Sequence, residues 1–208
     1  MYIAITHVSH PDFPQCRTLP MTMLECTYGT VCYERTILQA MKRQDSEERL
    51  RKTPHFAISF SMRGHWYAPP NKNATVDDIG FFKPCYPLPI PIDFIPNSLC
   101  STPHGSNYRY YRDMTSEYTF NPATRFMMVF DSDYALKRKI CISRSQFRHL
   151  EFGIAVYDID YDSDDTPCPG MRIGPGFFNR LKLIRKLLEA VNSKNRYSAW
   201  SCDSQSSS

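Results

Sequence analysis

Short apolar runs alternate with amphipathic stretches along most of the chain. The apolar runs of strand length cover 2–8, 56–60, 125–132 and 152–160. The stretches with helix-forming residues and a one-sided apolar pattern cover 33–52, 133–147 and 177–192. Because the last two strands are almost continuously apolar, this alternation predicts a parallel α/β arrangement. In such folds, functional groups gather at the carboxyl ends of the strands.

The last helical stretch has the clearest pattern. Its apolar side chains at helical spacing are Phe177, Leu181, Ile184, Leu188 and Val191. The same pattern predicts that the charged side chains Arg180, Arg185 and Lys186 point outward. We therefore expect this helix to pack by one face and to expose its basic residues.

Residues 70–125 interrupt the alternation. They hold half of the prolines, many aromatic residues and two cysteines, Cys85 and Cys100, and they show no sustained helical period. This composition predicts an insertion of short strands and loops, stapled by a disulfide. The tail at 193–208 is rich in serine and is expected to be disordered. We therefore predict one domain over 1–192 that contains the insertion.

The composition is that of a globular chain with no obvious charged partner. The 208 residues are 42% hydrophobic and 13% aromatic, which allows a substantial core. The net charge of the chain is only +4, and its lysines and arginines are spread along the sequence. Both features argue against a dedicated nucleic-acid binder. No stretch approaches the roughly 20 apolar residues that a membrane span requires.

Eight cysteines, none in a C-x-x-C pair, favour disulfides in an oxidising compartment over a zinc site. Cys141 and Cys168 are expected to be bridged. The sequon Asn73-Ala74-Thr75 agrees with a secreted glycoprotein. The N-terminal 1–16, however, reads as a strand and not as a signal peptide. Features of a secreted protein without a signal peptide at the start are what we would expect of an N-terminally incomplete protein.

The acidic run within 152–170 allows three interpretations: a metal loop, a solvated strand end or the rim of a site. An EF-hand loop needs Gly at its sixth position and Glu at its twelfth. Counted from Asp158, these positions hold Ser163 and Pro169, so the sequence does not fit an EF-hand. We expect Asp162, Asp164 and Asp165 simply to solvate the loop. Tyr157, Asp158 and Asp160 are candidate rim residues, because an apolar strand ends there. No residue pattern points to a metal or another cofactor.

The order of these segments resembles the C-terminal half of the chitinase-like (β/α)8 proteins of glycoside hydrolase family 18. The stretch 152–170, "FGIAVYDIDYDSDDTPCPG", is similar to the family's last barrel strand, which carries Asp residues and is followed by Cys-Gly. Upstream, "MVFDSDYALKRKICISRSQF" is similar to its Asp-containing turn and a helix with a central Lys, here Lys137 or Lys139. The resemblance thus implies about strands six to eight of a TIM barrel, with an α+β insertion.

Earlier segments fit the same resemblance more loosely. "FAISFSMRGHWYAPP" is similar to the penultimate barrel strand, and "IAITHVSH" lies where the family has its sixth strand. The family's Tyr-Asp pair on that strand corresponds to His7 and Val8, and the Trp that floors its central sugar subsite corresponds to Tyr157. A Val cannot hydrogen-bond an acetamido group, and a Tyr offers a smaller stacking face.

The family's catalytic signature, Asp-x-x-Asp-x-Asp-x-Glu, has no counterpart in the sequence. Glu47 follows Asp45, but Arg43 and Ala40 occupy the other two positions. In the family this Glu protonates the glycosidic oxygen, and without it the leaving group would depart as an alkoxide. The resemblance therefore implies a domain that is catalytically incompetent as given, and no catalytic residue is assigned.

The resemblance implies non-catalytic binding of chitin or other glycans that contain N-acetylglucosamine. The expected contacts are Trp66, Tyr67, Tyr157 and Asp158, although packing of the insertion against the barrel explains Trp66 and Tyr67 equally well. One alternative is a fragment of an active secreted chitinase whose catalytic half is missing. Another is a secreted protein-interaction scaffold. Three barrel strands alone leave two bare sheet edges, so we also expect self-association.

Overall fold

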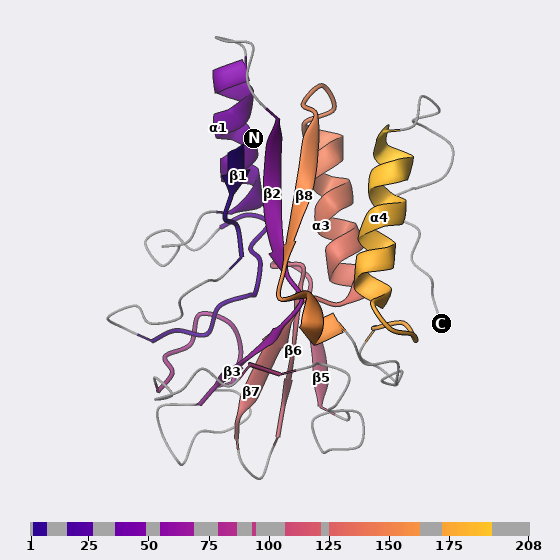
Figure 1. Cartoon of the computed structure of the whole chain (residues 1–208). Coiled ribbons are helices and arrows are strands. Elements are labelled where there is room, and N and C mark those ends of the chain that lie inside the picture. The colour runs from indigo at the N-terminus through magenta and orange to yellow at the C-terminus, as the bar shows by residue number, and fades with distance from the viewer. Residues whose placement is uncertain are drawn as a thin grey trace.

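The computed structural model describes residues 2–7, 16–26, 36–48, 55–68, 79–86, 93–94, 107–121, 125–162 and 172–192. These residues form two sheets and the helices that pack on them (Figure 1). The sequon at 73–75, the tail at 193–208, and Val8, Asp164, Asp165, Cys100 and Cys168 lie outside the described residues. Within the described part, no helix is long and apolar enough to cross a membrane, and no group of three His, Cys, Asp or Glu side chains could hold a metal ion.

The first sheet is parallel, as the alternation of strands and helices predicts. It consists of β1 (Tyr2–Ala4), β2 (Phe56–Ser61) and β8 (Phe152–Tyr157), in the order β1-β2-β8. All of β2 is buried, which agrees with its predominantly apolar composition. The sheet is open, and the described residues form no closed barrel. The α/β class is therefore confirmed.

The helices α1 (Ile37–Glu48), α3 (Asp133–Gln146) and α4 (Asn179–Asn192) pack on the parallel sheet (Figure 1). Their apolar side chains share one core with alternate residues of the central strand and of β8: Phe56, Ile58, Phe60, Phe152, Ile154 and Val156. The opposite face of β2 carries the small residues Ala57, Ser59 and Ser61. One face of the sheet is thus the main core, and the other is lined by small side chains.

The pattern of α4 is confirmed for part of its length. Ile184 is buried, and Arg185 and Lys186 are exposed as predicted. Phe177 precedes the helix and is 54% exposed, so it does not belong to the packing face. The prediction that Arg180 points outward is wrong, because its side chain is buried under the ends of the strands.

The second sheet is antiparallel and has the order β4-β3-β7-β6-β5. Its strands are β3 (Gly64–Tyr67), β4 (Asp93–Phe94), β5 (Tyr108–Tyr111), β6 (Ser116–Phe120) and β7 (Met127–Phe130). In Figure 1 this sheet lies at the end of the parallel sheet where β2 passes into β3. Two of its strands lie outside the predicted insertion at 70–125: β3 precedes it in the sequence and β7 follows it.

One strand was assigned to the wrong sheet by the sequence pattern. The run at 125–132 was expected to join the parallel sheet, but β7 pairs antiparallel with β3 and aligns Met128 with Trp66. Asp131 therefore follows a strand of the second sheet and not the rim of the first. The reason is that β7 is fully buried, and a short buried apolar run looks the same in either kind of sheet.

A disulfide joins Cys85 to Cys16, and the two residues are 69 positions apart in the sequence. Backbone hydrogen bonds reinforce the crossing, since the Cys85 N–H donates to the Cys16 carbonyl at 3.0 Å. Cys26 is also disulfide-bonded. The expectation that Cys141 is bridged is wrong, because it keeps a buried thiol on α3. A helix face that packs into the core buries a thiol as a small apolar group and needs no bridge there.

Candidate functional site

The ends of the three parallel strands bring together the polar residues His7, Ser59, Ser61, Tyr157 and Asp158. Tyr157 ends β8 and is aligned with Ser61 at the end of β2, while His7 lies beyond β1. The carboxyl ends of parallel strands meet at one edge of a sheet, so this grouping follows from the topology. We call these five residues the strand-end rim.

Tyr157 is the exposed aromatic residue of the rim. Its side chain is 37% exposed, whereas the strand residues before it are more covered. Its ring lies 4.7 Å from the His7 ring, at an interplanar angle of 41°. A tyrosine supported in this way presents a fixed ring face and a hydroxyl group to solvent, which suits stacking against a sugar.

His7 is buried beneath Tyr157 and is held by the central strand. Its Nδ1 lies 2.7 Å from the Ser59 hydroxyl, which also accepts a hydrogen bond from the Thr6 N–H at 2.8 Å. Because a hydroxyl has one proton and two acceptor positions, Ser59 either donates to Nδ1 of a ring protonated on Nε2 or accepts from Nδ1–H. Burial lowers the pKa of His7, against a smaller opposing effect of Asp158, and so keeps the imidazole neutral.

Asp158 follows Tyr157 with a left-handed backbone, at a φ of 56°. Its Oδ2 accepts a hydrogen bond from the Ser61 hydroxyl at 2.5 Å and lies 3.7 Å from Nε of Arg63. A non-glycine residue in this conformation carries strain that its surroundings must offset, and such residues cluster at functional sites. The hydrogen bond from β2 supplies that restraint and turns the carboxyl group across the strand ends.

The other two predicted contacts, Trp66 and Tyr67, lie on β3 in the antiparallel sheet. Tyr67 is 2% exposed, belongs to the core of the antiparallel sheet and donates its hydroxyl to the Leu19 carbonyl at 3.4 Å. Trp66 is 9% exposed and meets the edge of Phe126, with ring centroids 6.5 Å apart. The structure therefore brings Tyr157 and Asp158 together and leaves Trp66 and Tyr67 little surface for a ligand.

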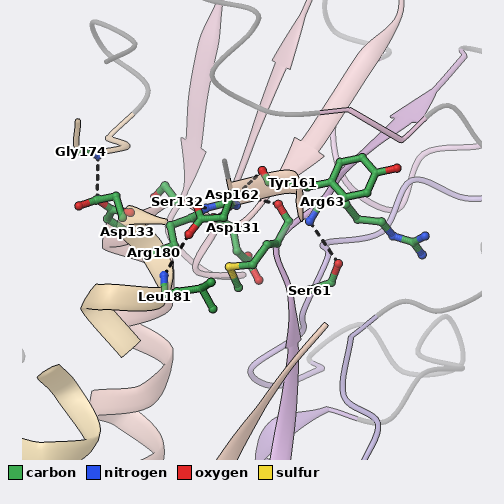
Figure 2. Close-up of polar contacts among 12 residues, drawn as sticks. Ser61, Arg63, Asp131, Ser132, Asp133, Tyr161, Asp162, Gly174, Arg180 and Leu181 are labelled. Atoms are coloured by element: carbon green, nitrogen blue, oxygen red, sulfur yellow. Dashed lines mark hydrogen bonds and ion pairs between the residues drawn. The ribbon is translucent and has the colours of Figure 1, made fainter. Parts of the chain in front are cut away.

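A buried arginine, Arg180, joins the segments that follow β2, β7 and β8 (Figure 2). Nε of Arg180, in the first turn of α4, donates to Asp162 Oδ1 at 2.7 Å. Its Nη2 donates to the Met62 carbonyl at 2.6 Å, and its Nη1 donates to the Asp131 carbonyl at 3.2 Å. Arg180 thus ties together the ends of β2, β7 and the 3-10 turn Ile159–Asp162 that follows β8.

The expectation that Asp162 solvates a loop is therefore wrong. Its side chain is buried, and its Oδ2 accepts a hydrogen bond from the Leu181 N–H at 3.0 Å. A buried carboxylate beside a buried guanidinium satisfies both charges, which lets the acidic run enter the interior. Sequence reasoning missed this pair because its members lie on different elements, with no periodic spacing between them.

A second buried charge cluster links the antiparallel sheet to α3. Lys139 forms an ion pair with Asp131, and both side chains are 0% exposed. Glu117 on β6 accepts hydrogen bonds from the Tyr108 hydroxyl and, at 3.1 Å, from the Ser132 N–H at the N-cap of α3. Burial raises the pKa of Glu117 to about 8 and lowers that of Lys139. The resemblance pointed to a central lysine on this helix, but nothing in the sequence singled out Glu117.

No protein-family model and no curated protein sequence matches the chain. Among solved structures, it is similar to the chitinase-like agglutinin from Robinia pseudoacacia, with 13% identity over 88% of this chain and 46% of that one and a TM-score of 0.59. A Group IV chitinase from Ostrinia furnacalis gives 16% identity over 90% and 50% of the two chains and a TM-score of 0.63. YKL-39, solved in the presence of chitooligosaccharides, gives 14% identity over 83% and 46% and a TM-score of 0.56.

These similar structures are all chitinases or chitinase-like proteins of glycoside hydrolase family 18. The chain spans about half or less of the length of each. At these identities the comparison establishes the fold, and it confirms the fold-level resemblance that the sequence motifs predicted.

Proposed function

We propose that this chain, which shares the fold of family-18 chitinases, binds chitin or other N-acetylglucosamine-containing glycans at the strand-end rim without hydrolysing them. In this proposal it supplies the C-terminal part of a (β/α)8 domain, about strands six to eight. The observation that carries the proposal is the exposed ring of Tyr157, supported by His7 at the carboxyl end of a parallel sheet.

The chemistry of the rim supports stacking combined with hydrogen bonding. An exposed aromatic ring can pack against the C–H face of a sugar, while the Tyr157 hydroxyl and the carboxyl group of Asp158 serve as hydrogen-bond partners for hydroxyl or acetamido groups. Trp66 and Tyr67, the other two candidates, are buried, so the proposal rests on Tyr157 and Asp158. Solved structures of related fold include one described as a complex with (GlcNAc)3.

The proposal of binding without hydrolysis rests on the missing acid. No Glu of this sequence has Asp residues two, four and seven positions before it. A glycosidic oxygen leaves readily only when a positioned acid protonates it. Because the chain spans about half or less of its structural neighbours, a second candidate is a piece of an active chitinase whose acid lies elsewhere.

We also propose that the protein is secreted. The Cys16–Cys85 disulfide and the sequon at Asn73 support an oxidising, glycosylating compartment. The intact mass of the native protein before and after enzymatic deglycosylation tests this part of the proposal. A single unchanged mass with fully reduced cysteines would contradict it.

Calorimetric titration with a tetramer of N-acetylglucosamine tests the main proposal. We expect Tyr157→Ala to weaken binding by about tenfold or more, because a lost aromatic contact is worth roughly 1.5 kcal/mol. Tyr86→Ala is the matched control, since Tyr86 is 63% exposed and lies outside the rim. Equal affinity of the two variants, or no binding by the unmodified protein, would overturn the proposal. Release of free sugar during the titration would favour the active enzyme.

A further inference from the structure

Arg172, shortly before α4, lies over two tyrosine rings. Its guanidinium carbon is 4.6 Å from the ring centroid of Tyr134 on α3 and 5.0 Å from that of Tyr110 on β5. The two rings meet edge to face, with centroids 5.1 Å apart. This arrangement fixes the cation by cation–π contacts on one side and leaves its side chain exposed on the other.

The backbone around Arg172 is restrained on its C-terminal side. Ile173 is buried, and the Gly174 N–H donates to Asp133 Oδ2 at 2.7 Å, which ties the segment to the start of α3. Arg172 itself has a left-handed backbone with a φ of 49°. An arginine gains nothing locally from that conformation, so the surrounding contacts hold it there. The guanidinium is thus positioned before any ligand arrives.

A second arginine acts on the same ring. Arg138 follows Tyr134 by one helical turn, and its positive charge acts on Tyr110. Among the described residues, no carboxylate lies within ion-pair distance of Arg172 or of Arg138. Arg172 thus contacts Tyr110 directly, Arg138 lies one helical turn beyond Tyr134, and no carboxylate of the described residues pairs with either cation.

We propose that Arg172 and Arg138 bind an oxyanion carried on a saccharide, either the carboxylate of a uronic acid or a sulfate ester. The planar fork of arginine matches both groups through paired N–H donors. The partly exposed Tyr134 ring beside Arg172 offers an apolar contact to the sugar that carries the charge. A nucleic acid fits less well, because phosphate backbones require many aligned cations and this site supplies two. The site shares no residue with the strand-end rim and stands independently of it.

Calorimetric titration of the full chain with a heparin-derived tetrasaccharide and with an oligogalacturonate of equal length tests this site, in salt of about 0.15 M. We expect one or both to bind, and Arg172→Gln to weaken that binding by about tenfold or more, as loss of a charge-assisted hydrogen bond implies. The dependence of log Kd on log salt should also flatten by about one. Whichever probe binds identifies the oxyanion.

Arg185→Gln is the matched control. It removes the same charge from an exposed position on α4, where Arg185 pairs with Glu189 at 2.9 Å, and it should change affinity less than about twofold. Arg138→Gln, a change on the partly exposed side of α3, should weaken binding even if Arg172→Gln were to disturb its strained segment. Equal losses in Arg172→Gln and Arg185→Gln, no binding of either probe, or stronger competition by a single-stranded polynucleotide of equal charge would overturn the proposal.

Discussion

Replacing Glu117 with Gln should stabilise the protein by an amount that grows with pH. Glu117 is completely buried between β6 and α3, and its pKa is raised from 4.5 to about 8, chiefly by burial. In the unfolded chain the same group ionises near its ordinary value. Between these two values the unfolded state releases a proton that the folded state keeps, so the free energy of unfolding falls as pH rises.

The magnitude follows from the two pKa values. Each tenfold difference in proton affinity corresponds to about 1.4 kcal/mol, so moving the pKa from 4.5 to about 8 corresponds to a loss on the order of 5 kcal/mol once pH exceeds 8. Glutamine is neutral like the protonated acid: its carbonyl accepts from the Ser132 N–H, and its amide donates to the Tyr108 oxygen once the Tyr108 hydroxyl, which donates to Glu117 in the unmodified protein, has rotated away. The variant should therefore equal the unmodified protein below pH 4.5 and exceed it by about that amount above pH 8.

Urea unfolding of both proteins measures this difference in the free energy of unfolding, at pH values from 4 to 9 that are spaced by roughly one unit. Glu189→Gln is the control, because Glu189 is exposed on α4 and its replacement should give a small difference that hardly varies with pH. A difference for Glu117→Gln that stays flat with pH would refute the reasoning. A variant less stable throughout would mean that the folded protein holds Glu117 ionised.

Three further predictions concern the buried links and the open sheet. Arg180→Met should destabilise the fold by about 3–5 kcal/mol in urea unfolding, because it leaves Asp162 as an unpaired buried charge, whereas Arg185→Met should change stability by less than about 0.5 kcal/mol. Replacing both Cys16 and Cys85 with Ala should cost about 4 kcal/mol, given the 69-residue separation, and an unchanged melting temperature would contradict this. The outer edges of β1 and β8, which pair with no further strand among the described residues, should cause concentration-dependent self-association in sedimentation experiments, and a monomer at all concentrations would contradict that expectation.

The regular elements could be predicted from sequence because their periodicity is strong. The runs at 56–60 and 152–160 became the paired strands β2 and β8, since the strands of a parallel sheet covered by helices are predominantly apolar. The same reasoning failed for 125–132, because the apolar pattern of a short buried strand does not reveal its direction. Which strands pair depends on residues that are distant in sequence, and β7 pairs antiparallel with β3.

The charged positions show the same limit more sharply. Solvation is the usual state of an acidic run, yet Asp162 is buried because Arg180 comes to it from another element. Glu117 gave no sequence signal, because its neighbours Tyr108 and Ser132 meet it only after the antiparallel sheet has formed on α3. Tyr157 and Asp158 could be located in advance, since the end of a parallel strand is a position that sequence can identify.

The measurement that tests the central claim most directly is a titration of isotopically labelled protein with a tetramer of N-acetylglucosamine, followed by the shifts of backbone amide signals. The account predicts saturable shifts that centre on Tyr157 and Asp158 and extend to the Ser59–Ser61 end of β2, with little change at Tyr110 and Arg172. Shifts centred elsewhere, or none at saturating sugar, would contradict the assignment of the strand-end rim as a glycan-binding surface.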